Sequence, residues 1–152
     1  MIITEIIGNI KDLSKADLQQ YHIEKVYLDN ESLAKRIHHV KTDHDNEVHV
    51  RLAAKHHLRV GDILYQDAQR IVVVEVLSED VLIIQPTTIY DMGVIAHALG
   101  NRHLPAQFEG DIMLVQYDYL VERLLGEMGY NYRREERYVE EPFRHIGHSH
   151  DE

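Results

Sequence analysis

The first half of the chain has the polar and apolar pattern of short β-strands. Apolar and polar residues alternate strictly over 47–52, with Val48 and Val50 on one face, as in a strand that buries one side. Other runs are rich in β-branched residues and are separated by turn residues. Short strands at this spacing predict a small sandwich-like or barrel-like β domain over residues 1–77. The predicted strands are Ile2–Ile7, Leu33–Thr42, Glu47–Leu52, Ile63–Tyr65 and Arg70–Leu77.

After Leu77 the pattern changes to strands that alternate with helices. Val81–Ile84 is a short apolar run typical of a buried strand. Thr87 or Thr88 is placed to cap the helix that follows, and Gly100 marks the end of that helix. We therefore expect an α+β protein whose second domain, residues 78–142, is ferredoxin-like, with the order β-α-β-β-α-β. Its later elements are predicted as strands near 106–108, 112–115 and 130–139 and a helix over 117–126.

Composition and charge exclude several classes of protein. The 152 residues include no cysteine, which rules out disulfides, thiolate metal sites and a cysteine nucleophile. No apolar run approaches the roughly 20 residues of a membrane helix, and the start lacks the pattern of a secretory signal, so we expect a cytoplasmic protein. The formal charge of −10 disfavours nucleic acid as a partner and favours a cation or a basic protein surface.

Histidine is the most unusual feature of the composition, with 12 residues in the chain. Neutral imidazole is the commonest metal-ligating side chain, and histidine without cysteine indicates a borderline metal such as nickel, zinc or copper(II). Taken singly, most of these histidines are interpreted as ordinary surface residues, because adjacent residues on a strand point to opposite faces. These are His22, His38, His39, His44, His49, His56, His57 and His97.

His103 is the first candidate metal ligand. It lies just past the expected helix end, on a turn stiffened by Pro105, where a side chain is exposed and held in one direction. The alternative is that the histidine only completes the helix end by bonding its last carbonyl groups. One imidazole does not hold a metal tightly, so a His103 site requires a second copy of the chain across a twofold axis.

The C-terminal residues 143–152 supply the other candidates. They have too little apolar content to pack, so we expect a mobile tail. His145, His148 and His150 lie on it, and three imidazoles on a flexible arm can close on a metal that is held elsewhere. The alternative is a solvated tail without a metal role.

The sequence favours a carrier over an enzyme. The carboxylates show no recognisable catalytic spacing, and the His-Glu-x-x-His motif of zinc proteases is absent. We predict no catalytic residue and no organic cofactor.

One stretch, Gly100-Asn101-Arg102-His103-Leu104-Pro105, resembles the signature segment of the UreE family of urease accessory proteins. Gly61–Leu64, Asp118–Gly129 and Glu141–Phe143 are similar to further segments of that family, so the resemblance covers essentially the whole chain.

The resemblance implies a metallochaperone that binds nickel(II) and delivers it for assembly of the urease active site. It implies a homodimer formed through the second domain, in which two copies of His103 share one nickel ion and the tail histidines complete the site. The first domain would dock other proteins, and the partners would be an accessory GTPase and the urease maturation complex. A metal that bridges two dimers would produce a tetramer.

Two other functions are consistent with the residues: a zinc- or copper(II)-binding interaction module without nickel delivery, and a metal-dependent enzyme. Imidazole ligands do not by themselves prefer nickel to zinc, and copper(II) binds more tightly than either. The prediction of nickel therefore rests on the resemblance.

Overall fold

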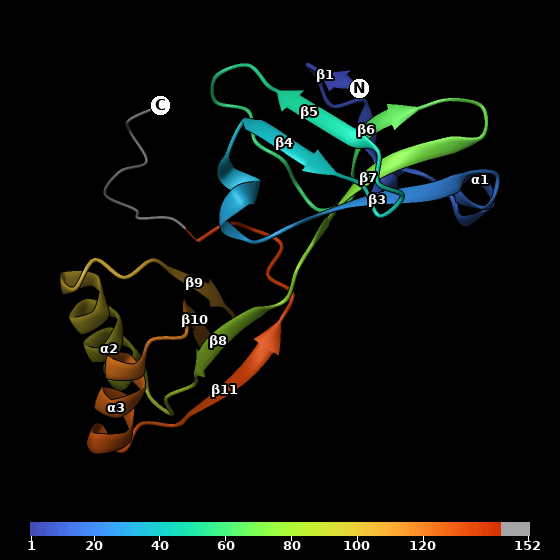
Figure 1. The fold of residues 1–152 in the computed structure, drawn as a ribbon. Helices are drawn as coiled ribbons and strands as arrows, with labels where there is room; N and C mark the ends of the chain where they lie inside the picture. The colour runs from blue at the N-terminus through green and yellow to red at the C-terminus, as the bar shows by residue number, and fades with distance from the viewer. Residues whose placement is uncertain (144–152) are drawn as a thin grey trace. The chain divides into compact units, whose positions relative to one another are not determined.

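The computed structural model describes residues 1–143 and consists of two compact units (Figure 1). The first unit comprises Met1–Leu77 and Val139–Pro142, and the second comprises Ser78–Tyr138 and continues from Phe143. The predicted tail and its three histidines lie outside the described residues, apart from Phe143.

The first unit contains two sheets. A four-stranded sheet has the order β2-β6-β7-β3, and a three-stranded sheet has the order β1-β5-β4. The four-stranded sheet is formed by β2 (Gly8–Asn9), β6 (Asp62–Gln66), β7 (Arg70–Val76) and β3 (His22–Leu28). The smaller sheet is formed by β1 (Ile2–Ile3), β5 (Glu47–Arg51) and β4 (Ile37–Lys41). Neither sheet closes into a barrel.

Apolar residues from both sheets form one core. Val48 and Val50 of β5 belong to the same buried cluster as Val26 of β3 and Val74 of β7. Each such side chain contributes roughly 1.5–3 kcal/mol through its removal from water. The two sheets therefore pack as a sandwich, which confirms the sandwich-like form of the predicted β domain.

The other face of the central strand β7 is buried as well. Its Ile71 and Val73 pack against apolar residues of η1 (Ile10–Asp12) and α1 (Lys15–Gln19) and of the segment between them. The sequence pattern does not predict these short helices, nor the strand β3. Strand β3 carries His22, Glu24 and Lys25 among its apolar residues, so its alternation is weak, and it becomes a strand by pairing in parallel with β7.

Glu24 is a buried carboxylate that connects the two sheets. Its side chain accepts hydrogen bonds from Thr42 and from Asn46 (2.7 Å), both in the β4–β5 turn, and from Arg70 of β7 (3.1 Å). Burial alone would raise the pKa of Glu24, but these three donors outweigh it and hold the pKa below its ordinary value. The charged carboxylate therefore fixes the β4–β5 hairpin against the larger sheet.

Replacing Glu24 by Gln should lower the free energy of unfolding at pH 7 by about 1–3 kcal/mol, because hydrogen bonds to a charged acceptor are lost in a buried site. A depressed pKa means that this stability is present above the ordinary pKa of glutamate and is lost as the pH falls through the lower folded value. The difference between variant and wild type should therefore shrink below about pH 4.3. Urea unfolding followed by circular dichroism tests this, with Glu5→Gln as the exposed control; a pH-independent difference would contradict it.

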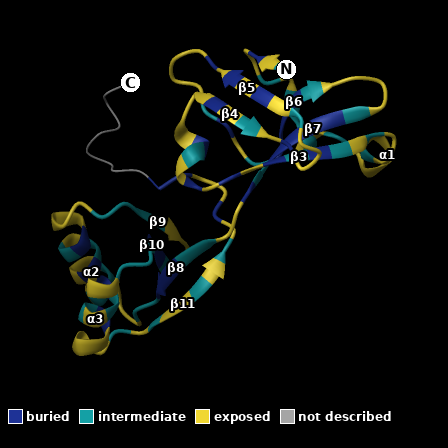
Figure 2. Cartoon of the chain, in the orientation of Figure 1, coloured by how far each residue is buried: buried dark blue, intermediate teal, exposed yellow. Residues whose placement is uncertain are grey.

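The second unit has the predicted ferredoxin-like order. Its antiparallel sheet has the strand order β11-β8-β10-β9, and both helices pack on one face, with their buried sides turned to the sheet (Figure 2). The elements are β8 (Glu79–Ile84), α2 (Ile89–Asn101), β9 (Ala106–Glu109), β10 (Ile112–Gln116), α3 (Tyr119–Met128) and β11 (Tyr132–Arg137). Of the described helices, none is long and apolar enough to span a membrane.

After β11 the chain returns to the first unit, whereas the sequence pattern predicts that residues 78–142 form one domain. The fully buried Asn30 donates hydrogen bonds to the carbonyl groups of Val139 (3.0 Å) and Glu141 (2.8 Å). Lys11 forms an ion pair with Glu140 (2.9 Å). These polar contacts, which leave no periodic pattern in the sequence, hold the segment on the first unit.

Candidate metal centre

Helix α2 places the first candidate ligand, His103. Its N-cap is Thr88, whose hydroxyl accepts a hydrogen bond from the amide of Asp91 (3.1 Å). Ile95 and Leu99 are spaced by four residues and are buried in the core of the second unit. The helix is therefore anchored at its start by the cap and along one side by apolar packing.

The end of α2 is closed by a Schellman motif. The amide of His103 donates to the carbonyl of Gly100 (3.0 Å), and the amide of Leu104 donates to the carbonyl of Leu99 (3.3 Å). Leu104 packs against the core cluster that contains Leu99, which is the apolar contact that usually accompanies this motif. A Schellman motif requires a left-handed backbone at the residue just before Leu104. That residue is His103, and its φ is 59°.

A histidine occupies a backbone position that usually belongs to glycine. A side chain in the left-handed region costs about 1–2 kcal/mol, which the surrounding structure has to compensate. His103 is exposed, and Pro105 restricts the chain directly after it. The imidazole is thus held at the surface by a backbone that packing and two hydrogen bonds determine.

Glycine at this position should therefore give a more stable protein than alanine. We expect His103→Gly to exceed His103→Ala in the free energy of unfolding by about 1 kcal/mol, because both lack the imidazole and only alanine keeps the strained backbone. Urea unfolding with a chelator present measures the difference without a contribution from bound metal. Equal stabilities would show that the left-handed conformation carries no strain.

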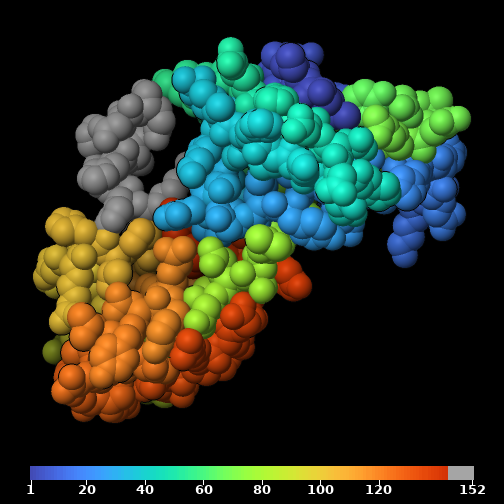
Figure 3. All heavy atoms as spheres, viewed as in Figure 1, coloured from blue at the N-terminus to red at the C-terminus, as the bar shows by residue number. Residues whose placement is uncertain are grey.

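The outward side of α2 exposes several apolar side chains on the helix that ends before His103. Ile89 and Tyr90 are 93 % and 78 % exposed, and Val94 is also exposed. Together with their neighbours they line a shallow groove along the helix, formed by Ile89, Tyr90, Gly93, Val94, His97, Ala98 and Asn101. We call these seven residues the α2 face; α2 and α3 form one side of the second unit in Figure 3.

The structure locates one of the four predicted ligands. His145, His148 and His150 lie outside the described residues.

Within residues 1–143, one group of three metal-ligating side chains lies close together, and it is in the first unit: His39, Glu47 and His49. Taken singly in the sequence, both histidines are interpreted as ordinary surface residues. The signal that could have found them is the hairpin register, since two exposed positions on paired strands are neighbours across the sheet.

The fold and the exposed histidine define a class: a two-domain α+β protein with a β-sandwich unit and a ferredoxin-like unit that presents a histidine at the end of its first helix. The models for the N-terminal and C-terminal domains of the UreE urease accessory protein match residues 3–77 and 79–151. The chain therefore belongs to the UreE family of urease accessory proteins.

Individual relatives are similar over their full length. The urease accessory protein UreE of Staphylococcus carnosus is 60 % identical over 99 % of this chain and 100 % of its own. The proteins with the same description from Staphylococcus epidermidis and Staphylococcus saprophyticus are 59 % and 57 % identical over the same shares.

Proposed function

We propose that this protein is a cytoplasmic nickel carrier for urease assembly, which binds nickel(II) through His103 at a homodimer interface and passes it on without catalysing a reaction. The observation that carries the proposal is the left-handed, exposed His103 at the end of α2. Membership of the UreE family supports urease maturation as the process, with an accessory GTPase and the maturation complex as the receiving proteins.

A second copy of the chain supplies what one histidine lacks. One imidazole is a single ligand, whereas a twofold axis beside His103 would place two equivalent imidazoles at one ion. The α2 face offers the apolar surface for such an association, because it is exposed and lies on the helix that ends at His103. A metal shared between two such dimers would give a tetramer.

The tail histidines complete the proposed site. Two fixed imidazoles leave coordination positions open, and His145, His148 and His150 belong to the same chain, beyond the segment that returns to the first unit. Ligands that bind and leave one at a time suit transfer to an acceptor protein, in contrast to a closed structural site with all ligands fixed by the fold.

His103→Ala should remove the tightest nickel site while the protein remains a dimer. Replacement of His145, His148 and His150 by alanine should weaken nickel binding or lower the number of ions bound, with the dimer unchanged. Calorimetric titration with nickel, combined with mass measurement of the assembly, reports affinity, ion number and oligomeric state together. His56→Ala, another exposed histidine, is the matched control.

Two results would contradict the proposal. Wild-type protein that binds nickel no more tightly than about the millimolar range would be an interaction module without a metal role. Metal-dependent turnover of a substrate that is lost in His103→Ala would identify an enzyme.

Tyr90→Asp should convert the dimer to a monomer, because it places a charge on the α2 face. Tyr119→Asp is a matched control, since Tyr119 is also an exposed tyrosine (65 %) in the first turn of a helix in the same unit. Sedimentation velocity without added metal measures the effect. A dimer that survives Tyr90→Asp and dissociates with Tyr119→Asp would place the interface on α3 instead.

A further inference from the structure

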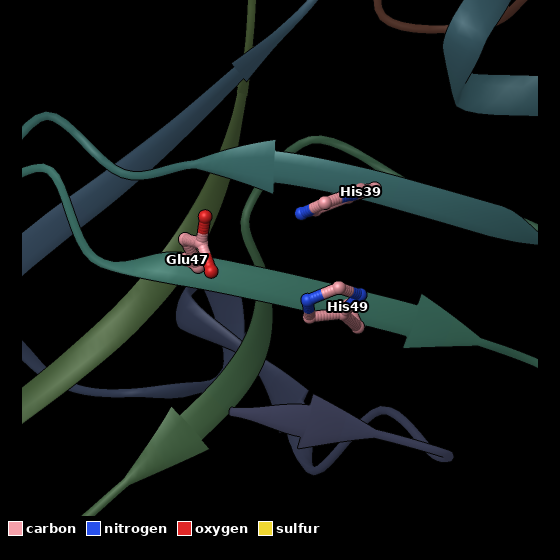
Figure 4. Close-up of side chains that lie close together, drawn as sticks. All are labelled: His39, Glu47 and His49. Atoms are coloured by element: carbon pink, nitrogen blue, oxygen red, sulfur yellow. The ribbon is translucent and has the colours of Figure 1, made fainter.

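The β4–β5 hairpin brings three potential metal ligands to one exposed face of the smaller sheet. His39 of β4 is directly opposite His49 of β5, and their rings stack with centroids 3.9 Å apart. Glu47 is two residues before His49 on β5 and therefore points to the same side. Figure 4 shows the three side chains standing together on the two neighbouring strands.

The ligand atoms of these residues are close to one another and are not engaged elsewhere in the described part of the chain. One nitrogen of each imidazole and one carboxylate oxygen lie within 4.8 Å of one another. Among residues 1–143, the structure shows no hydrogen bond or ion pair that engages the Glu47 carboxylate or the ring nitrogens of His39 and His49. The ligand atoms of these three side chains are therefore available to a cation.

The spacing suits a transition-metal ion. Ligand atoms at about 2.0–2.2 Å from a tetrahedral ion lie about 3.3–3.6 Å apart, so small rotations of three exposed side chains suffice to close the site. The backbone is already fixed by the strand pairing and by Glu24, which holds the hairpin turn. Two imidazoles and one carboxylate are a donor set that favours borderline divalent metals over calcium or magnesium.

We propose that His39, Glu47 and His49 form a second divalent metal site, on the β domain, which binds zinc, nickel or copper(II) with coordination positions left open to solvent. The site uses neither His103 nor the tail, so it is independent of the proposed nickel carrier function. An open position at the surface allows a further ligand, from solvent or from another molecule, to enter the coordination sphere.

A second histidine pair in the same unit is the main competitor. The Nε2 atoms of His22 and His44 lie 2.7 Å apart, and Nδ1 of His44 contacts the Asp43 carboxylate at 2.7 Å. These rings are hydrogen-bonded to each other, and within the described residues they do not belong to a group of three ligands. A metal would have to break an existing hydrogen bond there, which favours the His39 site.

The test uses the full-length chain with His103, His145, His148 and His150 replaced by alanine, so that the carrier site is absent. Zinc is titrated calorimetrically into this protein and into versions that also carry His49→Ala, Glu47→Gln, His44→Ala or the control His56→Ala. Loss of even an outer-shell partner of a metal ligand costs roughly 10–100-fold in affinity, so His49→Ala should weaken zinc binding at least about tenfold. Glu47→Gln should weaken it as well, and His44→Ala and His56→Ala should not.

Imidazole resonances give an independent readout. With copper(II) added at a substoichiometric level, the His39 and His49 ring signals should broaden before those of His22, His44 and His56. Zinc binding that is unchanged by His49→Ala, or that is lost with His44→Ala instead, would overturn the proposed site. Circular dichroism of His49→Ala separates loss of a ligand from loss of the fold. If His49→Ala does not fold, the decision rests on Glu47→Gln, and unchanged zinc binding in that variant overturns the site.

Discussion

The end of helix α2 depends on one constraint, the left-handed backbone conformation of His103. The Schellman bonds to Gly100 and Leu99 end the helix, bring Leu104 back to the core and send the chain into β9. Glycine would meet the same geometric requirement without strain. Histidine takes up this conformation at a cost in free energy, and the packing of Leu99 and Leu104 compensates for that strain.

In the second unit, backbone geometry positions the exposed His103. In the first unit, a buried charged side chain, Glu24, determines where the exposed groups of a hairpin lie. Glu24 is held ionised by Thr42, Asn46 and Arg70, and through the first two it fixes the turn between β4 and β5. A hairpin fixed at its turn has a fixed register, since a slip by one residue would move every side chain to the other face. The pairing of His39 with His49 follows from that register and not from any proximity in the sequence.

Periodicity predicted the ferredoxin-like unit well because its helices and strands are long enough to show their period. The cap at Thr88 and the stripe of Ile95 and Leu99 are local signals in that unit, and the alternation in β5 is a local signal in the first unit. The parallel strand β3 and the return of Val139–Pro142 are not local: they depend on pairing with β7 and on the side chain of Asn30. The same limit applies to the sites. The exposed position of His103 could be predicted because a glycine precedes it and a proline follows it, whereas the pairing of His39 with His49, ten residues apart, requires the sheet register.

The two histidine arrangements also differ in what they demand of the protein. The His103 imidazole has a fixed direction but is a single ligand and does not chelate an ion. In the proposed carrier, the affinity for the metal must therefore come from a second copy of the chain and from further ligands that bind afterwards. A cross-strand pair with a nearby carboxylate has chelation within one chain, but its rings stand on exposed positions and must rotate to close on an ion. Binding at the first would require the assembled dimer, because two chains supply its ligands. Binding at the second would require one chain alone, and that contrast distinguishes the two sites in a single protein.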